Sequence, residues 1–319
     1  MAASSTISKI QVESRTSTIR PRRKISKRMG VIPFLFLFPF GIFFLLFFVV
    51  PIFYALYQSF FTTHRSGLGL SAPTTTFAGL SNYHDVFLDA NFFSGIGRVL
   101  LFGVVQVPVM LGLALLLALL LDVKAARFKS FFRVSFFVPY AIPGVIAALL
   151  WGYLYTPQLS PFVQLARSLN LPAPDFLGAG TILWSMANIT TWTWTGYNML
   201  IITAALQAIP TELYEAARLD GCSGWRIARS IKIPMVAPAL VLTCVFSIIG
   251  TLQLFTEPVV LSSISNSVTS SYTPNYYAYF TAFSNNNYTY TAALCVVLAL
   301  VSFAFSFGFL KLTQRFSGV

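Results

Sequence analysis

The stretch ELYEAARLDGCSGWRIARSIKIP, residues 212–234, is a dense cluster of charge set between the apolar runs of this chain. It holds three of the nine acidic residues and four of the 21 basic ones, although long apolar runs flank it on both sides. The whole chain is 56% hydrophobic and 9% charged, with a mean hydropathy of +0.73. Soluble domains carry about 25% charged residues. The sequence therefore predicts a polytopic membrane protein with one conspicuous polar segment.

Six apolar segments are long enough to cross a hydrocarbon core of about 30 Å as helices. Prolines interrupt the first and third segments, which membrane helices tolerate where neighbouring groups satisfy the freed carbonyls. Residues 31–319 are expected to form one transmembrane domain, with the polar loop 210–234 between helices four and five. We predict an all-α fold of six transmembrane helices at about 31–62, 95–121, 131–156, 178–207, 235–262 and 288–312.

Lysine and arginine gather on one side of this predicted topology. Eighteen fall in the two terminal tails and in the connections that contain residues 122–133 and 212–234. The other side has three, which are Arg65, Arg98 and Arg167. Cytoplasmic loops carry the excess of positive charge in membrane proteins. Both termini and the quoted stretch are therefore expected in the cytoplasm, with the chain in the cytoplasmic membrane as a multi-pass protein.

The basic N-terminal tail accounts for much of the net charge of +12. Residues 1–30 carry eight basic side chains, and we expect a disordered cytoplasmic tail that abuts the first span. The apolar run that follows continues past Phe60 without a small-residue cleavage site, which predicts an anchor and not a cleaved signal peptide. Because the positive charge follows the membrane topology, no nucleic-acid partner is predicted.

Residue types that carry enzyme chemistry are scarce. The three cysteines show no metal-ligand spacing, which favours a packing role, and both histidines lie in a polar stretch outside the spans. The chain has no phosphate-binding loop of the form G-x-x-x-x-G-K-[ST]. We therefore predict no catalytic residue, no metal site and no bound cofactor, and the protein is not expected to be an enzyme.

Within 212–234 the local signals predict two short helices. Thr211 is expected to cap the first helix, and Gly221 to end it in the left-handed conformation. Ser223 is expected to cap the second helix, and Pro234 to stop its simple continuation. Such short helices need a partner surface. A helix lying on the headgroups is the alternative, but the acidic side chains of the first helix would face an anionic leaflet.

The spacing of this stretch resembles the EAA loop of bacterial binding-protein-dependent ABC importer permeases. That pattern reads E-A-A, three residues, G, nine residues, then I-x-L-P, and Ile233 for leucine is the single departure here. The flanking LQAIP, VPYAIPGVIAALLW at 138–151 and YYAYFTAF with YTYTAAL within 276–294 are similar to the carbohydrate-uptake branch, which includes maltose permeases. The stretch LSSISNSVTSSYTP at 261–274 replaces the LTGGGP-like turn common in that branch, so a different outer loop is expected.

The resemblance implies a half-transporter. A second, homologous permease subunit would pair with it, and two cytoplasmic ABC ATPase subunits would bind ATP and Mg²⁺. An extracytoplasmic solute-binding protein would deliver a sugar or oligosaccharide. The residues implied in coupling to the ATPases are Glu215, Ala216, Ala217, Asp220, Gly221, Ile231 and Pro234.

Polar and aromatic side chains inside two predicted spans suggest where the solute passes. Sugars present apolar C–H faces and hydroxyl rims, which suit aromatic platforms beside amides and hydroxyls. Interhelical hydrogen bonds and an aromatic belt at the membrane interface are the alternative explanation. The candidate path residues are Trp194, Tyr197, Asn198, Ser247, Thr251, Gln253 and Glu257.

The absence of basic residues from the middle of the spans favours a neutral sugar, because an anion is better served by an arginine fork. A permease for glycerol 3-phosphate, a glycerophosphodiester or a polyol is the alternative. A secondary transporter would need internal repeats and ion-coupling carboxylates, of which only Glu257 is a candidate. An intramembrane enzyme would need a paired acid and base or a nucleophile within the spans.

Overall fold

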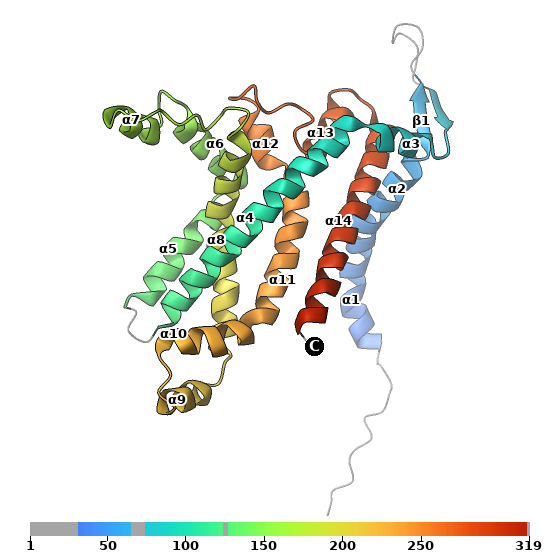
Figure 1. Cartoon of the computed structure of the whole chain (residues 1–319). Helices are drawn as coiled ribbons and strands as arrows, with labels where there is room; N and C mark the ends of the chain where they lie inside the picture. The colour runs from blue at the N-terminus through green and yellow to red at the C-terminus, as the bar shows by residue number, and fades with distance from the viewer. Residues whose placement is uncertain (1–30, 65–73, 124–126, 318–319) are drawn as a thin grey trace, which may run out of the picture. The chain divides into compact units, whose positions relative to one another are not determined.

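The computed structural model describes residues 31–64, 74–123 and 127–317 (Figure 1). The expected basic tail 1–30 lies outside this range. Contacts divide the chain between Pro51 and Ile52 into two compact units. The expectation of a single domain over 31–319 stays a prediction.

The first unit contains α1 (Val31–Phe44), a π-helical turn (Leu45–Val49) and the start of α2 (Val50–Gln58). Pro33–Gln58 forms a continuous apolar helix of 26 residues, which is long enough to span a bilayer. Pro51 sits just after the π-helical turn. The wider turn keeps the helix going past a residue that lacks an amide hydrogen.

The second unit is helical apart from one hairpin. Its strands are β1 (Phe61–His64) and β2 (Thr74–Phe77), which pair antiparallel. Its helices in chain order are α3 (Ser81–Leu88), α4 (Ala90–Asp122), α5 (Lys129–Ala141), α6 (Gly144–Tyr155), α7 (Pro161–Ser168), α8 (Ile182–Gln207), α9 (Thr211–Leu219), α10 (Gly224–Ile227), a π-helical turn (Ala228–Lys232), α11 (Ile233–Leu252), α12 (Thr256–Leu261), α13 (Pro274–Phe283) and α14 (Tyr288–Ser317).

The hairpin and the third span correct the expected fold. The chain is mostly helical but not all-α, because the threonine-rich ends of the loop after α2 pair as short strands. The predicted span 131–156 is two helices, α5 and α6, that meet at a bend of 93°. Pro143 occupies this bend with extended backbone, φ −53° and ψ 132°, so the helix cannot run straight through.

Pro234 does not end the second helix of the loop, as the sequence suggested. α10, the π-helical turn and α11 form one continuous helix, because the Ile233 amide bonds the Ala228 carbonyl five residues back. This wider turn accommodates the proline ring, as it does before Pro51. The second half of the quoted stretch, from Gly224 onward, is thus continuous with the fifth predicted span.

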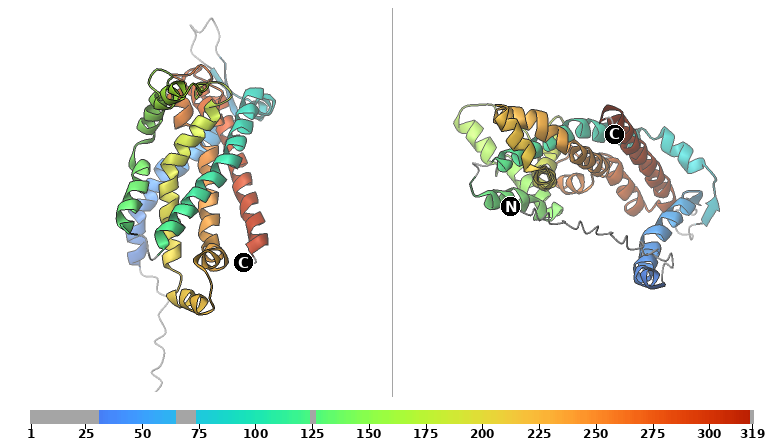
Figure 2. Two further views of the ribbon diagram at one scale, coloured as in Figure 1. Left: turned by 60° about the vertical axis from the view of Figure 1, so that its left-hand side comes forward. Right: turned by 90° about the horizontal axis from the view of Figure 1, so that it is seen from below.

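Long helices α4, α8 and α11 form the centre of the second unit, with α5 against α8 and α14 against α11 (Figures 1 and 2). Buried alanines on α4, Ala114 and Ala118, pack against Met199 and Ile202 of α8. Small residues at such contacts let membrane helices approach closely. α4 and α8 are therefore packed closely together next to the cavity that is described below.

Within the described residues, four helices are long and apolar enough to span a membrane, or five if the bent α5–α6 pair counts as one. α8 is not among them although it has 26 residues, equal to about 39 Å of helix. Asparagine, threonine and tryptophan side chains lower its hydropathy. The polar side chains of α8 therefore set it apart from the apolar helices, and their positions are described in the next subsection.

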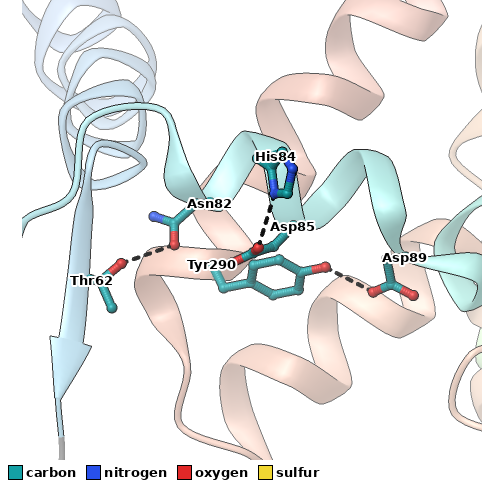
Figure 3. A network of polar contacts seen from close by, with 6 residues as sticks. All are labelled: Thr62, Asn82, His84, Asp85, Asp89 and Tyr290. Atoms are coloured by element: carbon teal, nitrogen blue, oxygen red, sulfur yellow. Dashed lines mark hydrogen bonds and ion pairs between the residues drawn. The ribbon is translucent and has the colours of Figure 1, made fainter.

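The end of the second unit opposite α9 is fastened by a polar network (Figure 3). Asp89 caps α4 by accepting the amide hydrogens of Asn91 and Phe92, at 2.9 and 3.3 Å. Its other oxygen accepts hydrogen bonds from the Tyr277 and Tyr290 hydroxyls, at 2.7 and 2.8 Å. One carboxylate therefore joins the start of α4 to α13 and α14.

The hairpin is fastened to the same end of the unit through α3. Asn82 is buried, and its amide donates to the backbone carbonyls of Ser59 and Phe61, at 2.8 and 2.7 Å. Its side-chain oxygen accepts a hydrogen bond from Thr62 of β1 (Figure 3). A single amide side chain thus fixes where the hairpin leaves α2.

Replacing Tyr277 with phenylalanine should destabilise this end by about 1.5–3 kcal/mol at neutral pH, because it deletes a hydrogen bond to a charged group. Burial raises the pKa of Asp89, but the two tyrosines and two amides outweigh it and hold the pKa below the usual value. Burial and the bond to Asp89 raise the pKa of Tyr277 to about 12. Thermal unfolding in detergent, followed by tryptophan fluorescence, measures the effect.

The directions of the two pKa shifts set the pH range in which the hydrogen bond between Tyr277 and Asp89 stabilises the fold. The depressed pKa of Asp89 gives stability that is present above about pH 4 and is lost as the pH falls through its folded value. The raised pKa of Tyr277 gives stability that is present below about pH 10 and is lost as the pH rises through about 12. The difference in stability between wild type and Tyr277→Phe should thus be constant from about pH 5 to about pH 9. Tyr279→Phe, on the same helix, is the control, and an equal loss there would contradict the assignment.

Candidate functional site

The loop between α8 and α11 carries α9, which protrudes beyond the ends of the long helices (Figure 2). α9 begins directly after Pro210, and no side chain caps it, so the predicted cap by Thr211 is wrong. Proline ends the preceding segment with extended backbone, φ −56° and ψ 133°, and Thr211 is already helical. Glu212 in the first turn and Arg218 in the last turn both favour the helix dipole.

Two other predicted signals of the loop, at Gly221 and Ser223, are confirmed. Gly221 has a left-handed φ of +74°, and the Cys222 amide closes the helix end on the Ala217 carbonyl at 2.9 Å. Ser223 accepts a hydrogen bond from the Arg226 amide at 3.4 Å and so begins α10. The short helix α9 thus meets the long helix that begins with α10 at a tight glycine turn.

The residues expected in coupling are divided between a surface and a core. Glu215, Ala216, Asp220 and Gly221 are exposed on α9 and its turn, whereas Ala217 is buried. Ile231 is half-buried and Pro234 is exposed on the continuous helix that follows. Exposed apolar side chains extend this surface, with Leu219 at 90% and Trp225 at 73% exposure. A protruding surface of acidic and apolar side chains suits a protein partner better than water.

A cavity of about 310 Å³ lies among α4, α5, α8, α11 and α12. All seven residues that the sequence suggested for a solute path line it. They are Trp194, Tyr197 and Asn198 of α8, Ser247 and Thr251 of α11, Gln253 directly after α11, and Glu257 in the first turn of α12. The remaining lining residues include Gln106, Met110, Tyr140, Ile142, Gly144, Thr190, Thr193, Phe246, Gly250 and Phe255.

Three aromatic rings form one wall of the cavity. Tyr140 of α5 stacks on Tyr197 with ring centroids 4.7 Å apart, and meets Trp194 edge-on at 5.1 Å. Trp194 and Tyr197 are in turn perpendicular at 5.8 Å. Gly196 makes this possible because it lets the backbone of α5 touch α8 at Phe136. Sequence reasoning missed Tyr140, and the VPYAIP segment that precedes the bend was the signal available.

Amides and hydroxyls surround this aromatic wall. The Asn198 amide donates to the Trp194 carbonyl at 3.0 Å, and the Gln106 amide reaches the Thr191 hydroxyl at 3.4 Å. The hydroxyls of Thr193 and Ser247 donate to carbonyls one turn earlier in their own helices. Each such hydroxyl oxygen keeps its lone pairs for a ligand. The cavity can therefore accept and donate several hydrogen bonds.

One acidic residue, Glu257, lines the cavity. Glu257 lies in the first turn of α12 and is half-buried, and it forms no ion pair within the described part of the chain. No lysine, arginine or histidine is among the described residues that line the cavity. The arrangement suits a ligand with hydroxyl groups and an apolar face, and it disfavours an anion.

Comparisons with known proteins bear on the family and the fold of this chain. Residues 91–317 match the family described as the binding-protein-dependent transport system inner membrane component. The chain is 29% identical over 317 residues to the arabinooligosaccharides transport system permease protein AraP of Bacillus subtilis, covering 95% of this chain and 98% of AraP. It is 30% identical over 285 residues to the sn-glycerol-3-phosphate transport system permease protein UgpA of Agrobacterium fabrum, covering 87% and 94%.

A similar fold occurs in a solved structure of a bacterial alginate ABC transporter in complex with a periplasmic protein that holds an alginate pentasaccharide. The TM-score is 0.76 at 19% identity, and the alignment covers 90% of this chain and 95% of that one. At this identity the likeness concerns the fold alone.

Proposed function

Because the chain belongs to the family of binding-protein-dependent transport system inner membrane components, we propose that it is the permease subunit of an ATP-driven importer for a neutral sugar or oligosaccharide. The observation that carries this proposal is the cavity, whose wall of Tyr140, Trp194 and Tyr197 faces amides and hydroxyls. Sugar rings stack on aromatic faces while their hydroxyls exchange hydrogen bonds with such polar groups. The permease role is that of a transport subunit and not of an enzyme.

The rival solute is an anion such as sn-glycerol 3-phosphate, which the name of the relative UgpA specifies for that protein. A phosphate is bound best by a bidentate arginine. The described lining residues of the cavity include no cation, and the acidic side chain of Glu257 offers an anion no opposite charge. The chemistry of this half of the path therefore favours a neutral solute. The arabinooligosaccharides in the name of the relative AraP are of this kind.

Six membrane spans follow if α8 and the bent α5–α6 pair each count as one span beside the four apolar helices. An even number keeps both termini on one side, and the excess of lysine and arginine makes that side the cytoplasm. α9 is then cytoplasmic, and the hairpin, α7 and α13 face outward. The location proposed is the cytoplasmic membrane of a bacterium.

The protruding surface of α9 is proposed to dock into an ABC ATPase subunit. In the assembly we propose, a second permease completes the path, two ATPases bind ATP and Mg²⁺, and an extracytoplasmic binding protein delivers the sugar. Closure of the ATPases would displace α9 and switch the spans between outward-open and inward-open states. This chain itself would bind no cofactor.

Replacing Tyr197 with alanine tests the solute path. We expect uptake of a neutral oligosaccharide to fall by about tenfold, the equivalent of about 1.4 kcal/mol, because the substitution removes a stacking face. The measurement is uptake into proteoliposomes that hold the full transporter, using arabinooligosaccharides first and sn-glycerol 3-phosphate for comparison.

Tyr153→Ala is the matched control, since Tyr153 is a 60% exposed residue of α6 that does not line the cavity. It should leave uptake close to the wild-type rate. A transporter that takes up sn-glycerol 3-phosphate and no neutral oligosaccharide would refute the proposed solute. Equal uptake by wild type and Tyr197→Ala would refute the proposed path.

A further inference from the structure

A nearly buried ion pair joins the end of α4 to the helix that follows α9. The Lys232 amino group lies 2.5 Å from the Asp122 carboxylate, and the two side chains are 14% and 21% exposed. The other ion pair in the described residues, His84 with Asp85, is long at 3.6 Å and mostly exposed. Charges withdrawn from water attract each other more strongly than exposed pairs do. The Asp122–Lys232 pair therefore holds α4 and the helix after α9 together more strongly than an exposed pair would.

The same lysine also contacts α9. Its amino group lies 5.3 Å from the centre of the Tyr214 ring, within the range of a cation–π interaction. Tyr214 packs against the core that α4 shares with α8, and its buried hydroxyl has no hydrogen-bond partner within the described residues. Burial and the nearby charge of Asp122 both raise the pKa of this tyrosine. Lys232 thus connects α9 with α4 through two side chains.

α4 carries this contact to the cavity. Met110 and Gln106 line the cavity from α4, about 18 and 24 Å of helix before Asp122. The far end of α4 is fixed by Asp89. A displacement of Asp122 therefore acts on one end of α4. The other end of α4 is fixed at Asp89, and the part between them lines the cavity.

A second route from α9 to the cavity is covalent. The helix from Gly224 to Leu252 is continuous through its π-helical turn, and Ser247 and Thr251 lie on it. Without the ion pair, α9 would be joined to α4 only through apolar packing, whereas its connection to α11 would remain covalent. Both routes include Lys232, which ends the π-helical turn of this helix.

We propose that Asp122, Lys232 and Tyr214 form a latch that makes the α4 wall of the cavity move together with α11 when α9 is displaced. The proposal rests on the function proposed above for α9. Lys232 occupies the open position x of the I-x-L-P pattern, so the latch is a feature of this chain and is not specified by that pattern. All three are positioning residues, since none lines the cavity.

The test compares the two routes in one protein. Single reporter cysteines, Gln106→Cys on α4 and Ser247→Cys on α11, are placed in a chain whose three native cysteines are replaced by alanine. The complete transporter, with its ATPases, is labelled by a small methanethiosulfonate reagent before and after trapping with ATP and vanadate. In the unaltered latch, trapping should change the labelling rate at both positions.

Asp122→Asn with Lys232→Gln removes the pair without leaving a buried, unpaired charge. We expect ATPase copurification and the change at Ser247→Cys to persist, and the change at Gln106→Cys to be lost. The exchanged pair Asp122→Lys with Lys232→Asp should restore most of that change. Asp85→Asn, which breaks the exposed pair, is the control and should alter neither rate.

If trapping still changes the labelling rate at Gln106→Cys when Asp122→Asn and Lys232→Gln are both present, the proposed latch is wrong. The proposed importer function would not be affected by that result. Loss of ATPase association in that double variant would also overturn the latch, because the pair would then serve only to hold the fold. Failure of the unaltered chain to bind an ATPase, or to respond at either cysteine, would refute the proposed function and the latch with it.

Discussion

Replacing Glu215 with lysine should give a permease that inserts into the membrane but neither holds the proposed ATPase subunits nor transports solute. Glu215 is exposed in the middle of α9, which protrudes from the long helices (Figure 2). Its side chain supports no described ion pair, so the fold loses little. Reversing a charge in a docking surface costs several kcal/mol, which is about a hundredfold or more in affinity.

Two measurements on membranes that express the complete transporter check this result. ATPase copurification with a tagged permease reports docking, and size-exclusion chromatography reports folding. The matched control is Asp85→Lys, the same charge reversal on an exposed side chain of α3, at the opposite end of the unit. Normal ATPase retention and uptake in Glu215→Lys would show that α9 is not the coupling surface.

Local signals predicted most of the loop 210–234, because they act over one helical turn. Gly221 takes the left-handed conformation and Ser223 caps α10, as expected. The cap by Thr211 was wrong because Pro210 already sets the extended backbone that precedes a helix. Pro234 misled for another reason: the π-helical turn that relieves its clash leaves no signature in residue type.

The candidate path residues could be predicted because polar and aromatic side chains are costly in lipid and therefore stand out in an apolar chain. Their common location on one cavity follows from how α8 and α11 pack, which the sequence does not state. Tyr140 and Gln106 were missed because each reaches the cavity from a different helix. The hairpin was missed because its strands are four residues each and its flanks have loop composition.

Replacing Gly196 with alanine should separate α5 from α8 and destroy the aromatic wall. A Cβ at this position would stand 1.8 Å from the Phe136 carbonyl oxygen and 3.0 Å from the Phe137 Cα. Both are backbone atoms, so no rotamer change can relieve the clash and the whole of α5 must move. Adding a methylene to a well-packed core costs about 1–3 kcal/mol, and this contact with rigid backbone should cost about 3 kcal/mol or more.

Thermal unfolding in detergent should show the loss as a lower Tm, and uptake should fall with it because Tyr140 leaves Tyr197 when α5 retreats. Gly112→Ala is the matched control, as no atom lies within 4 Å of a Cβ added there on α4. Alanine favours a helix over glycine by up to about 1 kcal/mol, so this control should be neutral or stabilising. A normal Tm in Gly196→Ala would mean that α5 is free to shift along α8, and the stacked pair would then not be a fixed wall for the solute.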